Sequence, residues 1–232
     1  MDLRSLGIEA VLFDKDGTLF DFDATWVAWA EKLFVKLSDG DAALAGRLGA
    51  AIGFDRDSRR FVPGSPAIAG TPLDVARALA PVLNCDPHDL LRDINAAAAK
   101  VEVVSPVPLR PLLDGLRRAG LGLGVATNDG EAPARAHLAS AGVLEAFDFI
   151  VGADSGFTPK PHPAMCLGFA RAVQCDPRRI AMVGDSLHDL HAARAAGMIP
   201  IGVLTGPATR ATLEPHAALV LDHIGALAML SG

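Results

Sequence analysis

The chain has few cysteines and a deficit of positive charge. Cys85, Cys166 and Cys175 are odd in number and have no C-x-x-C spacing, so neither a disulfide framework nor a zinc site is expected. We expect buried free thiols instead. The 21 lysines and arginines are outnumbered by 27 acidic residues, and the net charge is −6. This balance disfavours the electrostatic attraction on which nonspecific nucleic-acid binding depends, so no nucleic-acid partner is expected.

Long apolar runs are also lacking. No uninterrupted stretch approaches the ~20 apolar residues that a membrane-spanning helix needs. The first four residues, Met1-Asp2-Leu3-Arg4, have neither the cationic nor the apolar region of a secretion signal. We therefore expect a cytoplasmic protein without a membrane partner, either a monomer or a homodimer. The length of 232 residues favours one main domain with an insertion.

Short apolar runs alternate with amphipathic helical patterns over most of the chain. The predicted strands lie at residues 8–13, 121–126, 147–151, 179–183, 199–203 and 218–221. The predicted helices between them lie at residues 111–118, 132–141, 163–173 and 187–196. Such alternation predicts an α/β fold, with a parallel sheet covered by helices on both faces.

Residues 23–105 break this alternation because they show helical patterns without a convincing strand. Four helices are predicted there, at residues 24–37, 42–51, 73–83 and 89–101. The chain thus divides into a core domain of residues 1–22 and 106–232 and an inserted helical domain of residues 23–105. Trp26 and Trp29, three residues apart in the first inserted helix, either pack inside the insertion or line a substrate pocket; the sequence favours packing.

Asp14-Lys15-Asp16-Gly17-Thr18 directly follows the first predicted strand. Ligands bind at the carboxyl ends of the strands in open parallel sheets. Side chains two apart on an extended chain point to the same face, so the two aspartates can converge on one site. Asp and Gly also commonly end a strand without any catalytic role, and these five residues alone leave both interpretations open.

Two further polar segments follow predicted strands. Thr127-Asn128 offers a hydroxyl and an amide that can hold a phosphate, although Thr127 can equally cap the next helix. Gly184-Asp185-Ser186-Leu187-His188-Asp189 places two carboxylates four residues apart, on one face of a helix's first turn. Capping and the helix dipole explain one such acid, but hardly both.

Lys160 lies between Pro159 and Pro161, which stiffen the backbone that carries it. A solvated loop lysine is one interpretation. The other rests on charge: four aspartates gathered in one cleft raise each other's pKa unless cations balance them. One ammonium and one divalent cation nearly balance the negative charges of the four aspartates. These aspartates are Asp14, Asp16, Asp185 and Asp189.

Together these segments resemble the four motifs of the haloacid dehalogenase superfamily, in the same order. The matching residues are Asp14-x-Asp16-Gly17-Thr18, Thr127, Lys160 and Gly184-Asp185-x-x-x-Asp189. The insertion resembles the helical (C1) cap of the subfamily that includes phosphoglycolate phosphatases and beta-phosphoglucomutases. The resemblance implies a Rossmann-like, three-layer α/β/α core with a mobile helical cap, and a small phosphomonoester as substrate.

The resemblance also implies roles for single residues. Asp14 is the nucleophile that forms an aspartyl phosphate, and Asp16 protonates the leaving group and later deprotonates water. Magnesium is bound by Asp14, the backbone carbonyl of Asp16, and Asp185. Thr127 holds phosphoryl oxygens, and Lys160, oriented by Asp189 or Asp185, neutralises charge. Further substrate contacts are predicted at Lys15, Gly17, Thr18 and Asn128.

Other interpretations differ in the residues they require. Asp16 argues against dehalogenation, which needs no leaving-group acid. A phosphonate hydrolase would need a Schiff-base lysine, and the candidates Lys32, Lys36 and Lys100 are better explained as solvated. A sugar-phosphate mutase remains the alternative to a phosphatase. A silent binding protein is disfavoured, because no motif residue is lost.

The inserted domain offers three arginines as candidate contacts for a second anionic group on the substrate, although a solvated surface is an equal interpretation. These are Arg56, Arg59 and Arg60. His162, His188 and His191 can suggest a transition-metal site, but the oxygen ligands favour magnesium. We therefore expect these histidines to lie around the site or on the surface.

Overall fold

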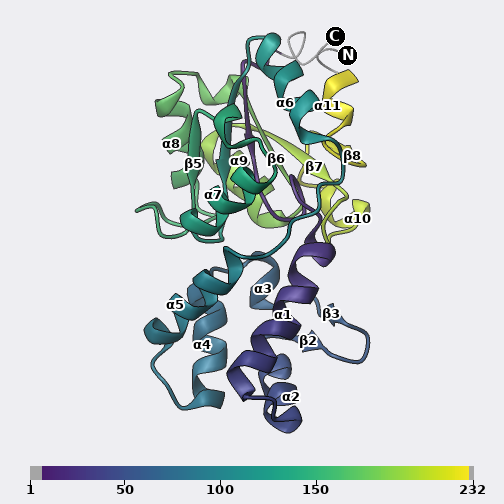
Figure 1. Ribbon diagram of the computed structural model, residues 1–232. Coiled ribbons are helices and arrows are strands. Elements are labelled where there is room, and N and C mark those ends of the chain that lie inside the picture. The colour runs from purple at the N-terminus through teal and green to yellow at the C-terminus, as the bar shows by residue number, and fades with distance from the viewer. Residues whose placement is uncertain (1–6, 230–232) are drawn as a thin grey trace.

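A computed structural model describes residues 7–229 and contains a six-stranded parallel sheet of order β5-β4-β1-β6-β7-β8 (Figure 1). Residues 1–4, in which no secretion signal was found, lie outside this range. The strands are β1 (Ala10–Phe13), β4 (Gly122–Ala126), β5 (Phe149–Val151), β6 (Ile180–Gly184), β7 (Ile199–Val203) and β8 (Leu219–Leu221). Each begins and ends within two residues of its prediction. Among the described residues, no helix combines the length and apolarity needed to cross a membrane.

Helices cover both faces of this sheet. They are α6 (Leu109–Arg118), α7 (Glu131–Ser140), α8 (Ala164–Ala172), α9 (Leu187–Ala196), α10 (Arg210–Leu213) and α11 (Ala226–Met229), with 3-10 turns at Leu144–Ala146 and Pro177–Arg179. Because side chains alternate along a strand, Val11 and Phe13 pack with α6, α7 and α11. Ala10 and Leu12 pack with α8 and α9 on the opposite face. The predicted three-layer α/β/α arrangement is therefore confirmed.

The register of the central strands aligns their carboxyl ends. Phe13, the last residue of β1, pairs with Val125 of β4 and with Val183 of β6. Asp14, Thr127 and Asp185 follow these three strands directly and therefore emerge at one edge of the sheet.

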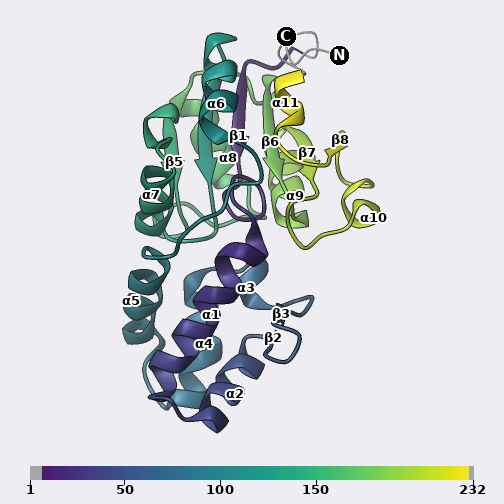
Figure 2. The ribbon, with the colours of Figure 1, turned by 45° about the vertical axis from the view of Figure 1, so that its right-hand side comes forward.

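The inserted segment forms a helical layer below this edge (Figure 2). Its helices are α1 (Phe22–Ser38), α2 (Ala42–Ala51), α3 (Pro66–Ala69), α4 (Pro72–Leu83) and α5 (Pro87–Ala98). Asp41 caps α2 by accepting from the backbone N–H groups of Ala43 and Leu44, and Thr71 and Asp74 form a capping box on α4. These caps fix where the helices begin.

The insertion has its own hydrophobic cluster. Trp26, Trp29, Phe34, Leu48 and Leu79 are among its members, and none of them belongs to the clusters beside the sheet. The division into a core of residues 1–22 and 106–232 and a cap of residues 23–105 remains a prediction, which this separation supports.

Three expectations about the chain need correction. The insertion contains a short antiparallel pair, β2 (Phe54–Asp55) and β3 (Arg60–Phe61), and the additional helix α3. Two-residue strands are too short to show an alternating pattern, so they cannot be predicted from periodicity. Helix α5 ends at Ala98, three residues before its predicted end. Of the cysteines, Cys166 is buried, but Cys85 is exposed.

Candidate active site

The loop after β1 turns sharply at the sheet edge. The backbone N–H of Asp14 still donates to Val183, and the carbonyl of Lys15 then accepts from the N–H groups of Leu19 and Phe20. Gly17 has φ +78, and a Cβ there would lie 2.4 Å from a carboxylate oxygen of Asp185. Only glycine allows this close approach of the loop to Asp185.

A second loop approaches the same carboxylate. A Cβ on Gly206, after β7, would lie 1.7 Å from Asp185 Oδ2. The neighbouring Thr205 hydroxyl donates to the carbonyl of Gly17 at 2.6 Å. Thr205 and Gly206 thus enclose the site, and the sequence analysis missed them because they lie outside the four motifs.

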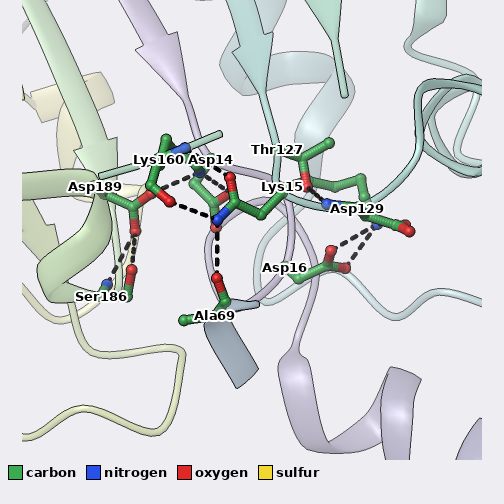
Figure 3. A network of polar contacts seen from close by, with 10 residues as sticks. Asp14, Lys15, Asp16, Ala69, Thr127, Asp129, Lys160, Ser186 and Asp189 are labelled. Carbon is green, nitrogen blue, oxygen red and sulfur yellow. Dashed lines mark hydrogen bonds and ion pairs between the residues drawn. The ribbon is translucent and has the colours of Figure 1, made fainter. Parts of the chain in front are cut away.

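Lys160 joins two of the aspartates. Its ammonium donates to Asp14 Oδ1 and to Asp189 Oδ1, each at 2.6 Å (Figure 3). The other oxygen of Asp189 accepts from the backbone N–H and the hydroxyl of Ser186, at 3.1 and 2.6 Å. Asp189 therefore both caps α9 and orients Lys160, so here the capping and functional interpretations of this acid hold together.

Asn128 fixes the backbone of Lys160. Its Oδ1 accepts from the N–H of Lys160, and its Nδ2 donates to the carbonyl of the same residue, both at 2.9 Å. Nδ2 also donates to the carbonyl of Ala69 in the cap at 2.8 Å. Both amide hydrogens are thereby used, so Asn128 positions the lysine and the cap instead of offering a free donor to the substrate.

Three buried carboxylates beside Lys160 lie close to one another. One oxygen from each of Asp14, Asp185 and Asp189 lies within 4.8 Å of the others, and all three residues are buried. Burial, reinforced by Asp189 and Asp16, raises the pKa of Asp14 to about 7 despite the opposing effect of Lys160. Burial and Asp14 likewise raise the pKa of Asp185. A hard divalent cation would offset the cost of ionising these buried carboxylates together. Asp14 and Asp185 therefore fit the predicted magnesium site.

Lys15 does not face the cavity that contains Asp14. Its buried ammonium lies 2.8 Å from Oδ1 of Asp16 and 3.1 Å from Oδ2 of Asp129. It also lies 3.1 Å from Nδ1 of His137. Burial lowers the pKa of Lys15, but Asp16 and Asp129 more than compensate and raise it. The structure does not support the predicted substrate contact at Lys15, because its buried ammonium binds Asp16.

One cavity connects the residues of the four motifs with the cap. Its lining includes Asp14, Asp16, Thr127, Lys160 and Asp185. Trp26 and Trp29 also line it while they pack in the cap cluster, so the packing and pocket interpretations are compatible. Gly17 and Thr18 do not line it: Gly17 gives room to Asp185, and Thr18 is fully buried.

The three cap arginines lie elsewhere. Arg59 forms an ion pair with Glu31, and Arg56 borders a separate shallow pocket beside β2. Arg60 belongs to β3, which projects from the flank of the cap (Figure 1). None of the three lines the cavity with Asp14. Their predicted substrate contacts are not supported, because the hairpin turns them away.

The three histidines do not form a metal site with one another. His188 lines the cavity. Nε2 of His191 lies 3.2 Å from Nδ1 of His216 on the surface. Nδ1 of His162 accepts from the backbone N–H of Ala164. Among the described residues, the one group with metal-binding geometry is the aspartate trio.

Comparison with known proteins identifies the family. Residues 8–197 match the model of the haloacid dehalogenase-like hydrolases. The chain belongs to this family. It is 32% identical to the probable phosphatase IndB of Dickeya dadantii, over 84% of this chain and 81% of that protein. It is 30% identical to the fructose-1-phosphate phosphatase YqaB of Escherichia coli, over 83% and 95% of the two chains.

A solved structure agrees with the fold. The predicted phosphoglycolate phosphatase of Haemophilus somnus aligns with a TM-score of 0.72 over 97% of this chain and 99% of its own, at 18% identity. The family match and the relatives named phosphatases confirm the predictions of an enzyme and of this family.

The buried position of Lys15 leads to a prediction about stability. We expect Lys15→Met to lower the free energy of unfolding by about 3–5 kcal/mol, because the carboxylates of Asp16 and Asp129 lose their cation. Lys36→Met is the matched control, since Lys36 forms an exposed pair with Asp93 and should cost at most ~1 kcal/mol. Urea denaturation measures both, and equal losses would contradict the structural role of Lys15.

The raised pKa of Asp14 leads to a prediction about magnesium and pH. Because this pKa is about 7, compared with about 3.9 in an unfolded chain, the carboxyl's contribution to metal-free stability is lost as the pH rises from about 4 through about 7. Magnesium binds the ionised form, so the rise in Tm at equal Mg²⁺ should be larger at about pH 8 than at about pH 6. Asp185→Asn should reduce the rise at both pH values. A wild-type rise that is independent of pH would contradict the assignment.

Proposed function

We propose that the protein is a magnesium-dependent phosphomonoesterase that acts through an aspartyl phosphate on Asp14. Its substrate is a small phosphorylated metabolite, either phosphoglycolate-like or a sugar phosphate. The observation that carries this proposal is the placement of Asp14: its buried carboxylate lines the cavity, binds Lys160 and lies beside Asp185. Hydrolase family membership and two relatives called phosphatases support the same reaction.

The reaction divides into two displacements. A carboxylate oxygen of Asp14 attacks phosphorus, the bond from phosphorus to the leaving oxygen breaks, and Asp16 gives that oxygen a proton. Water then attacks phosphorus, its proton passes to Asp16, and the bond to Asp14 breaks. Splitting hydrolysis in this way lets one carboxyl serve first as acid and then as base.

Charge is the main difficulty of the first step, because a phosphate dianion meets several carboxylates. Lys160 offsets part of this charge at the oxygen of Asp14 that it binds. Thr127, which is buried and lines the cavity, offers its hydroxyl to a phosphoryl oxygen. Bound magnesium would supply the remaining positive charge between the carboxylates and the phosphate.

Asp16 must change partner during the cycle. Both of its oxygens lie 2.8 Å from the ammonium of Lys15, although the residue lines the cavity. Protonating a leaving group therefore requires the carboxyl to turn from Lys15 toward the substrate. In the structure, the ammonium of Lys15 holds the carboxyl of Asp16 in the orientation that it has before this turn.

The proposal includes the setting in which the enzyme works. We place it in the cytoplasm as a monomer or homodimer, without a nucleic-acid or membrane partner. The net charge of −6 supports the absence of a nucleic-acid partner.

Replacing the nucleophile tests the central step. Asp14→Asn should lower kcat with p-nitrophenyl phosphate by at least about 10³-fold, because the amide cannot form the aspartyl phosphate. Circular dichroism should show an intact fold. Asp89→Asn, at an exposed ion pair with Arg92, is the control and should keep full activity. EDTA should abolish wild-type activity and added Mg²⁺ restore it; near-normal turnover by Asp14→Asn would refute the nucleophile.

The role of Asp16 is tested by the leaving group. Asp16→Asn should lower kcat/KM by about 10²–10⁴-fold with alkyl phosphates, which need an acid. p-Nitrophenolate leaves without protonation, so rapid mixing with p-nitrophenyl phosphate should still show a first-turnover burst, followed by slow hydrolysis. The absence of a burst, with equal losses on both substrates, would contradict the assignment of Asp16 as the acid.

A further inference from the structure

The wall of the cavity that the cap supplies is apolar. Every described cap residue that lines the cavity has an apolar side chain or is glycine. Trp26 and Trp29 contribute from α1, Ile68 from α3, Val75 from α4 and Ile94 from α5. Asp14 and this wall border the same cavity, so a phosphate bound to Asp14 would have the wall on its cap side.

The core side of the cavity offers no free cation for the leaving group. Lys160 is the one lysine or arginine among the described lining residues, and it is bound to Asp14 and Asp189. His188 is the other lining residue that can carry positive charge, and it is adjacent in sequence to the carboxylate of Asp189. Carboxylates dominate the remaining charge; they belong to Asp14, Asp16, Asp129, Asp185 and Asp189.

We propose that the substrate's leaving group is an uncharged alcohol, a sugar or a polyol, and that a carboxylate or second phosphate on it is selected against. This inference rests on the proposed phosphatase activity and narrows its substrate class. A second anion would lose its hydration without gaining a counter-ion, and an unpaired buried charge is strongly unfavourable. The same argument disfavours a mutase, which must accommodate a sugar that carries two phosphates.

The tryptophans favour an oxygen-rich neutral group over a plain hydrocarbon. Both indole N–H groups are buried, and neither has an acceptor in the described part of the chain. A buried donor without an acceptor costs about 1–3 kcal/mol. Hydroxyl or ring oxygens of a sugar or polyol are acceptors that would remove this cost, while its C–H groups pack on the indole rings.

An adjoining cavity contains the one competing cation. This cavity, of about 590 Å³, shares Asn128, Lys160 and His188 with the first and is also lined by Arg77. The guanidinium of Arg77 lies 3.7 Å from Oδ1 of Asp74, and the side chain of Arg77 is 62% exposed. A partly neutralised, solvated guanidinium gives a second anion little advantage over water. The apolar wall, not Arg77, therefore sets the preference.

A matched pair of substrates tests the inference on the wild-type protein. 2-Phosphoglycolate and 2-hydroxyethyl phosphate differ only by a carboxylate in place of a hydroxymethyl group. With Mg²⁺ present, kcat/KM should be at least about 10-fold higher for 2-hydroxyethyl phosphate. Fructose 1-phosphate should exceed fructose 1,6-bisphosphate in the same way. A preference for either substrate with the second anion would overturn the inference, whereas no hydrolysis of p-nitrophenyl phosphate would refute the phosphatase proposal itself.

A cation placed in the wall should reverse the selection. Ile68 is only partly buried, so Ile68→Lys can present its ammonium to the cavity and should raise the ratio of 2-phosphoglycolate to 2-hydroxyethyl phosphate turnover by about 10-fold or more. Ile68→Met, of similar size and without charge, should keep the preference for the neutral substrate. An unchanged ratio in a folded Ile68→Lys protein would contradict the role of the wall.

Two further variants separate the alternatives. Arg77→Gln should leave the ratio between the two substrates unchanged; a fall in 2-phosphoglycolate turnover alone would locate a second anion in the adjoining cavity and overturn the inference. Trp29→Phe keeps an aromatic ring but removes the N–H, so kcat/KM should fall by about 3- to 10-fold more with fructose 1-phosphate than with p-nitrophenyl phosphate. Equal falls would refute the role of the indole donor.

Discussion

Three carboxylates share one buried corner of this fold, and the ammonium of Lys160 lies between two of them. Without that cation, the buried carboxylate of Asp14 would lack its ammonium partner, and leaving a buried charge unpaired is strongly unfavourable. The requirement explains why so much of the surrounding structure positions Lys160. Asn128 binds its backbone from both sides, and Ser186 fixes Asp189 on the other side. The parallel sheet contributes by ending three strands at one level.

The sequence predicted this part of the molecule well for a physical reason. Buried parallel strands need continuous apolar runs, and ligand-binding residues follow their carboxyl ends, so Asp14, Thr127 and Asp185 could be placed at one sheet edge from local patterns alone. What could not be predicted depends on contacts between residues far apart in the chain. Lys15 is paired with Asp129 and His137, more than a hundred positions away. Nothing next to Lys15 indicates that its ammonium turns inward.

The side chains of the cap show the same limit of prediction from the sequence. A guanidinium indicates what a residue can bind but not which way it faces, and the orientation of Arg59 is set by the two-residue strand β3 and its pair with Glu31. The tryptophans were interpreted as packing residues, which is correct for their rings. Their position on α1, shortly after the loop that carries Asp14 and Asp16, also places them against the cavity. In a small cap around a single cluster, one side chain can serve both the hydrophobic core and the binding site.

The charged site and the cap are connected through the same side chains. Asn128, which holds the backbone of Lys160, also donates to the carbonyl of Ala69 in the cap. His137 accepts from Lys15 through Nδ1, and its Nε2–H donates to the carbonyl of Ala98 at the end of α5. Each hydrogen bond of this kind contributes only about 0.5–1.5 kcal/mol net. Each of these two links between the cap and the core is therefore individually weak. The side chains that position Lys160 and Lys15 therefore also hold the cap against the core.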